Sequence, residues 1–280
     1  MNTRFACRIG HVVFWISLAG TASAVDGVIE INQARALAGG VTAGDTPGFP
    51  VTISAQGSYR LTSNLATGSR DVTALLVEAD YVSVDLNGFT IACSFDPSPP
   101  TACTDPGVGR GVDAADRRGV SVSNGIVRDM GGRGIYLGEI GDVTRVKATG
   151  NGLEGIVIGS AGQIEKCIAF NNGFHGMSAG NGLITNSIAW NNKGYGIGVT
   201  GGVVMGNSAY LNETNGISAS GAMVIGNRAS SNGGFGLTLS VDTGYTQNVM
   251  VGNNDPNNFD DEVGSGVDLG ANVCHGMACP

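Results

Sequence analysis

The 280-residue sequence has few charged residues, few prolines and no basic cluster, and each shortage excludes a class of protein. Charged residues make up 14% of the chain and hydrophobic residues 42%, whereas disordered chains are rich in charge and poor in apolar residues. Eight prolines, and 47 glycines without a three-residue period, exclude a collagen triple helix. The formal net charge of −8 and the lack of a Lys/Arg stripe argue against binding to nucleic acid.

Long apolar runs are also missing, since none reaches the roughly 20 residues that a membrane helix needs. A short run from Val12 to Ala19 follows Arg4 and Arg8 and precedes the small residues at 22–24. This arrangement is typical of a secretory signal peptide, so we expect residues 1–24 to be removed after Ala24. The sequence therefore predicts a secreted or periplasmic protein without membrane insertion.

Cysteine spacing agrees with export. Cys93 and Cys103 flank a Pro-rich loop, and Cys274 and Cys279 close a short loop near the C-terminus. Each pair is predicted to form a local disulfide, which fits an oxidising compartment. We interpret the remaining cysteine of the mature chain, Cys167, as a small buried hydrophobic residue rather than a reactive thiol.

The middle of the chain repeats every 20 or 21 residues. A Gly followed by Ile, Met or Leu recurs at Gly134, Gly155, Gly176, Gly196, Gly216 and Gly236. Two more columns keep the same phase, namely Ala148, Ala169, Ala189, Ala209 and Ala229, and Asn151, Asn172, Asn192, Asn212 and Asn232. A fixed period of this length is typical of a solenoid. Leucine-rich repeats need several Leu per unit and helical repeats are longer, so neither fits.

Apolar residues alternate with small or polar ones after each repeated Gly, as in Ile156, Val157 and Ile158. Such alternation predicts a short strand with one face inward. Short strands separated by Gly and Asn turns stack as coils of a parallel β-helix, where equivalent residues lie about 4.8 Å apart. At the Asn column we expect a left-handed backbone and side-chain amides bonded from coil to coil.

These features resemble the right-handed parallel β-helix superfamily, the pectin-lyase-like fold. The resemblance covers residues 81–250 and is carried by the segment 84–91 (VDLNGFTI), by Asn124, Gly125 and Ile126, and by the Asn and Gly columns. It implies an all-β, single-stranded right-handed parallel β-helix. Families of this fold include pectate and alginate lyases, polygalacturonases, uronan epimerases, phage tailspikes and secreted proteins without assigned activity, so the resemblance specifies fold more than function.

The predicted domains are a signal peptide (1–24), an N-terminal cap with the first strands (25–80), the β-helix (81–252) with an inserted loop (92–118), and a C-terminal cap (253–280) closed by a disulfide. Residues 29–38 are predicted to form a short amphipathic helix over the N-terminal end. Caps are expected because an open end of a β-helix exposes unpaired strand edges.

A catalytic set is not evident in the repeats. The resemblance implies clustered aspartates for a galacturonan hydrolase, or an acidic calcium site with an Arg or Lys base for a pectate lyase. Between residues 143 and 241 there is no Asp, and Glu154, Glu165 and Glu213 stand in different columns. The acidic residues near 255–262 lack the spacing of a calcium loop. We therefore predict no cofactor and a solvated acidic cap at this end, with a calcium site as the alternative that the spacing does not support.

Glu154 and His175 occupy one column on consecutive coils and are the candidate catalytic pair. Within hydrogen-bond reach they could act as base and acid on a uronic acid. The alternative interpretation is an ion pair beside a turn with no catalytic role. A second candidate region is the charged stretch 110–147, where the inserted loop could cover a groove; its alternative is a solvated surface of mixed charge.

The candidate ligand-binding residues are aromatic. Phe170, Trp190 and Tyr210 each follow the Ala column, and Tyr195 stands in the column of Glu154 and His175. If the Ala side chains point inward, the first three rings stack on the surface and offer a platform for sugars. If the turn shifts the phase, these rings fill the core.

The favoured hypothesis is a protein that binds polysaccharide or a cell-surface glycan. The alternatives are a polysaccharide lyase or uronan epimerase and a purely structural surface protein. The sequence leaves the oligomeric state open.

Overall fold

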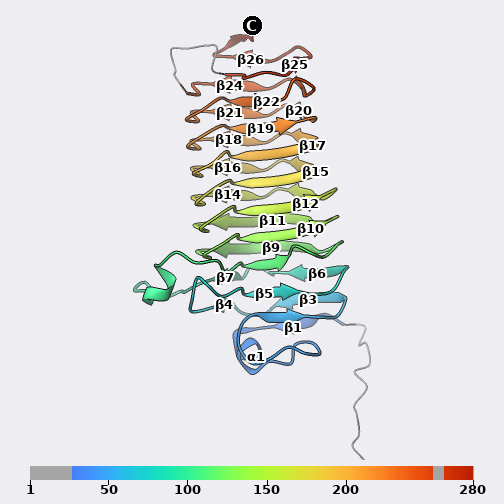
Figure 1. Cartoon of the computed structure of the whole chain (residues 1–280), viewed down its shortest axis with the longest axis vertical. Helices are drawn as coiled ribbons and strands as arrows, with labels where there is room; N and C mark the ends of the chain where they lie inside the picture. Colours follow the sequence, from blue (N-terminus) through green and yellow to red (C-terminus); the bar gives the residue numbers. More distant parts are fainter. Residues whose placement is uncertain (1–26, 255–261, 280) are drawn as a thin grey trace, which may run out of the picture.

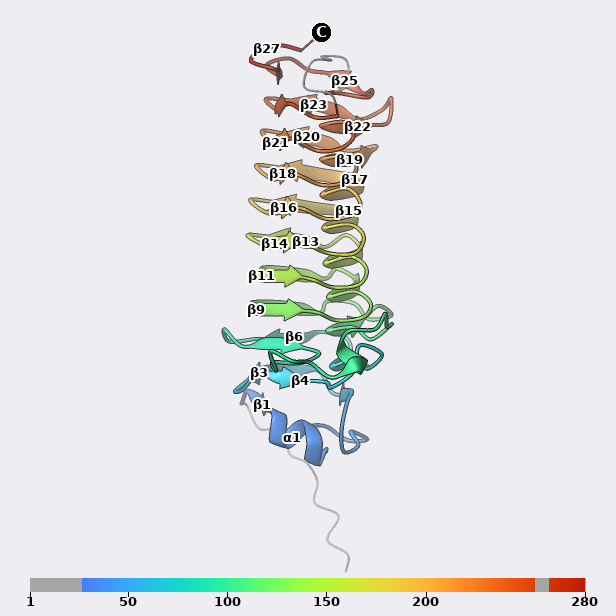
Figure 2. The ribbon, with the colours of Figure 1, turned by 90° about the vertical axis from the view of Figure 1, so that its left-hand side faces the viewer.

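The chain forms one stack of β-strand coils along a single axis (Figure 1). The computed structural model describes residues 27–254 and 262–279. The short helix α1 (Gln33–Ala38) lies beneath the first coils, and the view turned by a quarter shows the later coils following one another in regular succession (Figure 2). The predicted signal peptide lies outside the described residues.

Each coil contributes strands to three faces, which we call faces A, B and C in chain order. Face A contains β2 (Val51–Ile53), β5 (Leu75–Val77), β8 (Val112–Ala114), β10 (Ile135–Glu139), β12 (Ile156–Ser160), the first parts of β15 (Met177–Thr185) and β17 (Ile197–Met205), β19 (Ile217–Ser220) and β22 (Leu237–Leu239).

Face B contains β1 (Ile29–Ile31), β3 (Gly57–Leu61), β6 (Val82–Asp85), the first parts of β9 (Ser121–Arg128) and β11 (Asp142–Thr149), β13 (Gln163–Glu165), the last parts of β15 and β17, β20 (Met223–Ile225), β23 (Gly244–Thr246) and β25 (Val267–Asp268). Face C contains β4 (Leu65–Ala66), β7 (Thr90–Ala92), the last parts of β9 and β11, β14 (Ile168–Phe170), β16 (Ile188–Trp190), β18 (Ser208–Tyr210), β21 (Arg228–Ser230), β24 (Val249–Val251) and β26 (Val273–Cys274).

Residues one repeat apart pair in parallel register, which confirms the predicted solenoid. Ala169 pairs with Ala189, and Ala189 pairs with Ala209, and all three side chains are buried. Ile164 and Ile184 form an equivalent inward row on face B. The core is therefore a set of vertical rows in which each side chain packs on its equivalent in the next coil.

A close approach between coils explains the repeated glycines. A Cβ atom on Gly176 would lie 2.5 Å from the carbonyl oxygen of Gly196 and 2.8 Å from Nδ2 of Asn192. Such distances are shorter than a carbon atom can accept, so a side chain here would push the coils apart. The Gly and Asn columns thus work together, because each Gly leaves the space that the Asn amide of the next coil occupies.

The Asn column forms a buried amide ladder, as predicted. Nδ2 of Asn172 donates to Oδ1 of Asn192 at 2.9 Å, and Nδ2 of Asn192 donates to Oδ1 of Asn212 at 2.9 Å. Each Oδ1 also accepts the backbone N–H of the preceding Asn, and each Nδ2 also reaches a backbone carbonyl. The buried amide groups at the turn between faces C and A therefore have hydrogen-bond partners within the protein and need no water.

A second ladder, which the sequence reasoning missed, lines the turn between faces B and C. It runs through Ser187, Asn207, Asn227, Asn248 and Asn272. Cys167 stands in this row one coil earlier, where its backbone N–H donates to Oγ of Ser187 at 3.1 Å. Cys167 is buried and forms no disulfide among the described residues, and its sulfur lies within hydrogen-bond distance of the backbone carbonyls of Val143 and Glu165.

The left-handed backbone predicted at the Asn column is wrong by one residue. The ladder residues themselves do not have positive φ; the residue before each of them does, as at Asn171 (φ 55°) and Asn191 (φ 52°). The same holds in the second ladder, where Lys166 (φ 53°) precedes Cys167. A left-handed residue turns the chain, and the next residue then points its amide inward along the axis.

Both ladders end on a carboxylate. The amide N–H groups point toward the C-terminal coils, so the last Asn of each ladder would keep an unpaired donor. Nδ2 of Asn253 donates to Glu262, and Nδ2 of Asn272 donates to Oδ1 of Asp268 at 2.6 Å. An ionised carboxylate accepts only, which makes it a suitable terminus for a row of donors.

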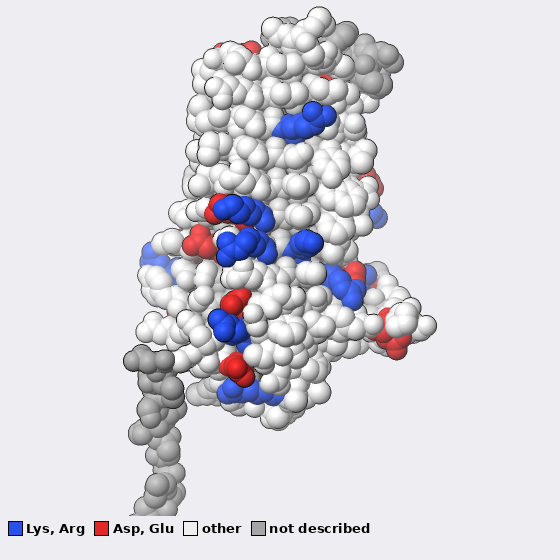
Figure 3. All heavy atoms as spheres, turned by 180° about the vertical axis from the view of Figure 1, so that it is seen from behind, with Lys and Arg blue, Asp and Glu red and all other residues white. Residues whose placement is uncertain are grey.

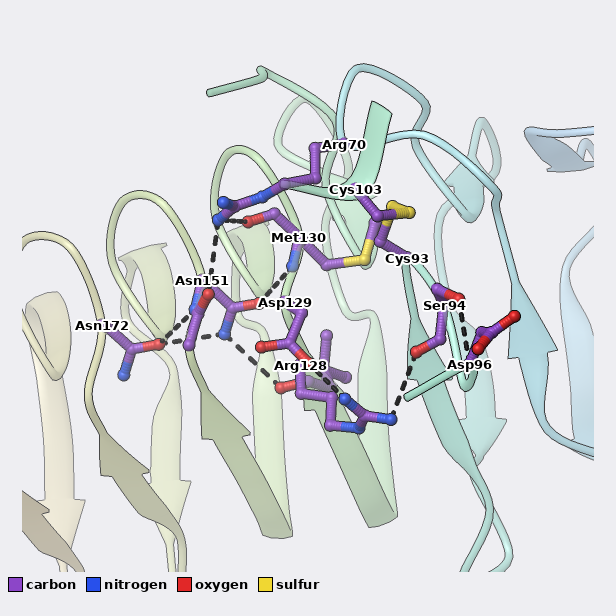
Figure 4. A network of polar contacts seen from close by, with 12 residues as sticks. Arg70, Cys93, Ser94, Asp96, Cys103, Arg128, Asp129, Met130, Asn151 and Asn172 are labelled. Atoms are coloured by element: carbon purple, nitrogen blue, oxygen red, sulfur yellow. Dashed lines mark hydrogen bonds and ion pairs between the residues drawn. A yellow bond between two sulfur atoms is a disulfide. The ribbon is translucent and has the colours of Figure 1, made fainter. Parts of the chain in front are cut away.

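The opposite end of the first ladder begins beside the Cys93–Cys103 disulfide (Figure 4). The backbone N–H of Met130 donates to Oδ1 of Asn151 at 3.2 Å, and Nη2 of Arg70 donates to the Met130 carbonyl at 3.0 Å. Arg128 pairs with Asp129 and also donates to the Ser94 carbonyl at 3.2 Å. The contact between Arg128 and Ser94 fastens the inserted loop to strand β9.

Two predicted boundaries at the N-terminal end require correction. Residues 29–38 are not one helix, because Ile29–Ile31 is strand β1, paired with β3, and only Gln33–Ala38 is helical. The helix begins after Asn32, whose Oδ1 accepts the N–H of Arg35 at 2.9 Å. The inserted loop is also shorter than 92–118, since Ala92 ends β7 and Val112–Ala114 is strand β8 of face A; a short 3₁₀ helix, η1 (Thr101–Cys103), lies between them.

At the C-terminal end the coils continue beyond residue 252. Strand β25 pairs in parallel with β23, and β26 pairs in parallel with β24. Strand β27 (Met277–Ala278) then turns back antiparallel on β26, and the predicted Cys274–Cys279 disulfide closes this hairpin. None of the helices in the described ranges is long and apolar enough to cross a membrane.

Candidate functional site

A groove of about 520 Å³ lies on the outer surface of face A, over β12, β15, β17, β19 and β22. Strand alternation turns two rows of small residues into it: Ser178, Gly198, Ser218 and Thr238 in one row, and Gly180, Thr200, Ser220 and Ser240 in the other. Small side chains at these positions make the surface hollow. Among the residues that the structure describes, no charged residue lines the groove.

Most hydroxyl groups of the groove have no partner among the described residues. The side chains of Ser178, Thr200, Ser218, Ser220 and Thr238 form no hydrogen bond there. Oγ1 of Thr238 is buried as well as unpaired. Ser240 differs, because its hydroxyl pairs with Asp242 and lies 2.9 Å from Oγ1 of Thr243. An unpaired hydroxyl on a groove wall keeps both its donor and its acceptor capacity for a ligand.

Tyr195 borders the groove with its ring laid across Gly198. A Cβ atom on Gly198 would collide with Cε2 of Tyr195 and lie 2.8 Å from the phenolic oxygen. The ring also stacks on His175, with centroids 3.3 Å apart and planes inclined by 9°. Burial raises the pKa of Tyr195, and the nearby Glu154 charge raises it further, so the phenol keeps its proton near neutral pH.

His175 is held as a neutral ring beside this tyrosine. Its Nδ1 accepts the backbone N–H of Tyr195 at 3.1 Å, so the proton of the neutral ring sits on Nε2. Burial lowers the pKa of His175 to about 4, although the charge of Glu154 acts in the opposite direction. The ring therefore positions Tyr195 and carries no charge near neutral pH.

The predicted pair of Glu154 and His175 is not joined by a hydrogen bond or ion pair in the described part of the chain. Glu154 is buried and pairs instead with the coil below, where its Oε2 lies 2.8 Å from Nε of Arg133. Two neighbours were available to Glu154 along its column. The guanidinium is always charged and binds a carboxylate through two nitrogens, so it outcompetes a neutral imidazole.

The charged residues predicted at the N-terminal coils form pairs around Tyr136. Arg110 lies 5.0 Å and Arg133 lies 4.6 Å from the centre of the Tyr136 ring. Each arginine is also neutralised, Arg110 by Asp113 at 2.7 Å and Arg133 by Glu154. From behind, the molecule likewise shows its charges of both signs gathered over the N-terminal coils, with little charge over the later ones (Figure 3).

The aromatic column faces outward on face C, since the Ala column is inward and each ring is half-buried. The rings stack on one another: Phe170 and Trp190 have centroids 4.8 Å apart, Trp190 and Tyr210 have centroids 6.1 Å apart, and both pairs are inclined by 3°. Stacking turns the ring faces toward each other along the axis. Little ring face is therefore left between neighbours for a sugar, whereas the ring edges remain open.

No cluster of three or more potential metal ligands occurs in residues 27–254 and 262–279. Three of the acidic residues near the C-terminus, Asp255, Asp260 and Asp261, lie outside these ranges. The carboxylate of Glu262 accepts a hydrogen bond from the Asn253 amide, and its Oε1 lies 2.9 Å from Nδ1 of His275.

Sequence reasoning named Tyr195 as a candidate ligand-binding residue but missed the groove beside it. The sequence did contain a signal for the groove, namely the Ser, Gly and Thr residues at the outward positions of face A. Sequence reasoning noted only that none of these residues is a strong acid or base. Only the structure shows that these hydroxyls are unpaired and share one hollow.

Comparisons with known proteins agree on the architecture. The family described as "Right handed beta helix region" matches residues 110–255. The A-module of mannuronan C-5 epimerase AlgE4 from Azotobacter vinelandii superposes with a TM-score of 0.55 at 17% identity, over 81% of this chain and 67% of that module. The enzymatically active domain of tailspike protein 2 from Bacteriophage CBA120 superposes with a TM-score of 0.54 at 14% identity, over 79% of this chain and 40% of that domain. This chain thus spans less than half of the tailspike domain, and identities this low establish the shared fold alone. No curated protein sequence matches the chain.

Proposed function

We propose that this chain, which belongs to the right-handed β-helix family, is an exported protein that binds polysaccharide in the groove of face A. The observation that carries the proposal is the set of unpaired hydroxyls in a groove bordered by the Tyr195 ring. Sugars present hydroxyl groups, which bind Ser and Thr, and apolar C–H faces, which pack on aromatic rings.

The length of the groove suits a chain rather than a single sugar. It extends over five consecutive strands of face A, from β12 to β22. Neighbouring coils are about 4.8 Å apart, so the hydroxyl rows repeat at regular steps along the axis. A polymer of similar units lying along the axis would meet the same kind of contact at successive coils.

The surroundings of the groove favour binding over turnover. Nδ1 of His175 is occupied by a backbone N–H, and the Glu154 carboxylate is held by Arg133. A general acid–base role would need these groups to reach a proton on the ligand. The fixed His175 ring instead supports Tyr195 from behind.

Export is part of the proposal. The signal peptide predicted from residues 1–24 would direct the chain out of the cytoplasm, and the two disulfides are stable in an oxidising compartment. A secreted or periplasmic protein meets polysaccharide at cell surfaces. The similar fold of a mannuronan C-5 epimerase supports a carbohydrate ligand.

The test compares two tyrosines on the chain beginning at Val25. Native gels containing single polysaccharides measure retardation, and Tyr195→Ala should weaken retardation by a bound glycan about tenfold, because one aromatic contact contributes about 1 kcal/mol or more. Tyr210→Ala, on face C, is the matched control and should bind like the parent protein.

Three outcomes would contradict the proposal. Failure of every glycan in a broad panel to retard the protein would remove the binding function. Loss of retardation in Tyr210→Ala but not in Tyr195→Ala would move the site to the aromatic column of face C. Release of unsaturated uronate that disappears in His175→Ala would show a lyase.

A further inference from the structure

We infer that the glycan bound in the groove of face A is neutral, and this inference rests on the proposed function. It goes further by choosing between two chemical classes of polysaccharide. Polymers of uronic acids carry a carboxylate on each unit, whereas neutral glycans offer only hydroxyls and ether oxygens. The groove and its borders distinguish the two classes by charge.

None of the described residues that line the groove is a cation that could receive a carboxylate, and all of them are uncharged. The nearest arginine along the column of Tyr195 is Arg133, and its guanidinium is already paired with Glu154. His175, between them, is neutral near pH 7 because its Nδ1 accepts a backbone N–H. A bound uronate would therefore lose water without gaining an ionic partner, which is costly.

The charge of the whole protein adds to this penalty. Removal of residues 1–24 leaves 13 basic and 23 acidic residues, a formal net charge of −10. At the C-terminal end of the groove, Ser240 is paired with the carboxylate of Asp242. A polyanion approaching this surface meets repulsion at long range and a carboxylate at the end of the groove.

The groove does offer what a neutral glycan needs. Ser178, Thr200, Ser218, Ser220 and Thr238 have no partner among the described residues, so each can donate to and accept from a sugar hydroxyl. A carboxylate, in contrast, only accepts and would use one half of this capacity. The Tyr195 ring, which keeps its phenolic proton, adds an apolar surface with a donor at its edge.

Affinity electrophoresis on the chain beginning at Val25 tests the inference with defined polymers. The neutral gels contain dextran, glucomannan or galactan, and the acidic gels contain alginate or polygalacturonate. We expect retardation in at least one neutral gel and none in the acidic gels. Retardation should be the same at 20 mM and 300 mM salt (about a fourfold change in Debye length), because neutral contacts are not screened.

Variants connect the result to the groove. Ser218→Ala with Ser220→Ala should weaken neutral binding about tenfold, since two hydrogen bonds are removed. Ser208→Ala, an equally small change on face C, should leave binding unchanged. Thr200→Lys places a cation on an exposed position of the groove and should create salt-sensitive retardation by polygalacturonate. Far-UV circular dichroism confirms that each variant folds.

Two results would overturn the inference. If the parent protein binds alginate or polygalacturonate and the Ser218/Ser220 double variant loses that binding, the groove accepts acidic glycans; the proposed function stands and the neutral class is wrong. If no polymer of either class retards the protein, the proposed function and the inference fall together.

Discussion

Asn192 is the position where the amide ladder can be tested most directly. Four hydrogen bonds meet at its side chain: Oδ1 accepts from the backbone N–H and from Nδ2 of Asn172, and Nδ2 donates to the Ala169 carbonyl and to Oδ1 of Asn212. All of these groups are buried. Replacing Asn192 by Ala removes the four bonds and cannot replace any of them.

The magnitude follows from the groups left behind. Oδ1 of Asn212 still accepts the backbone N–H of residue 192, so it keeps one partner. Two buried donors lose theirs, the Asn172 N–H and one hydrogen of the Asn172 amide, whereas the Ala169 carbonyl keeps its place in the ladder between β14 and β16. At about 1–3 kcal/mol for each buried polar group left unpaired, and with partial relaxation, Asn192→Ala should lower the free energy of unfolding by about 2–5 kcal/mol.

The neighbouring residue provides a matched control. Asn191 is exposed, has a left-handed backbone (φ 52°) and donates to Oδ1 of Asn171 at 2.7 Å. Asn191→Gly keeps the backbone conformation available and removes only this solvent-exposed bond, so we expect a loss below about 1 kcal/mol.

Urea unfolding followed by far-UV circular dichroism measures both changes, with free energies compared at a common slope. A loss below about 1 kcal/mol for Asn192→Ala, or equal losses for the two variants, would refute the idea that the buried amides hold the turn together.

Three further predictions follow from the described residues. Glu262→Ala should lower the free energy of unfolding by about 2–3 kcal/mol, because it leaves the terminal amide of Asn253 without an acceptor; an unchanged urea midpoint would contradict the carboxylate's role as a ladder terminus. Burial lowers the pKa of His175 to about 4, below the usual value of 6.5, so the unfolded chain takes up its proton first and stability should fall as the pH drops from 6.5 to 4. In His175→Gln this loss of unfolding free energy should be smaller by about 1–2 kcal/mol, a figure discounted for the partial exposure of the ring. Thermal melting at several pH values measures the loss, and the same pH dependence in the two proteins would disagree with a buried neutral ring. Burial raises the pKa of Cys167 to about 11, so in a chain beginning at Val25 a disulfide reagent at pH 8 should find no thiol in the folded protein and one after denaturation; rapid reaction of the folded protein would place Cys167 at the surface.

The sequence by itself determined the stacking register. Equivalent residues recur every 20 or 21 positions, and parallel strands bring such residues to the same place on successive coils, so Ala169, Ala189 and Ala209 had to share one row. Strand alternation indicated which rows of face A point inward, but only the structure decided that the Ala column, and not the aromatic column, points inward on face C. The two disulfides followed from spacing because both close short loops.

The boundaries at the ends were harder to predict because the period is lost there. Ile29 and Ile31 alternate over too few residues to distinguish a strand from a helical turn, and pairing with β3 decided the matter. The left-handed residues before the ladder were also hidden, since Asn171, Leu211 and Ser231 share no residue type that marks the turn.

Tertiary structure alone decided which neighbours interact within a row. Glu154 has Arg133 on one side and His175 on the other, and the sequence column shows both as equal candidates for pairing with its carboxylate. In the structure the carboxylate pairs with the Arg133 guanidinium, and His175 accepts a backbone N–H instead. The same is true of the groove, where Gly198 leaves room for the Tyr195 ring and the hydroxyls beyond it remain unpaired. A repeat fixes which residues are adjacent along the axis, but side-chain direction, burial and competition between partners choose the contact that forms, and these depend on all three dimensions.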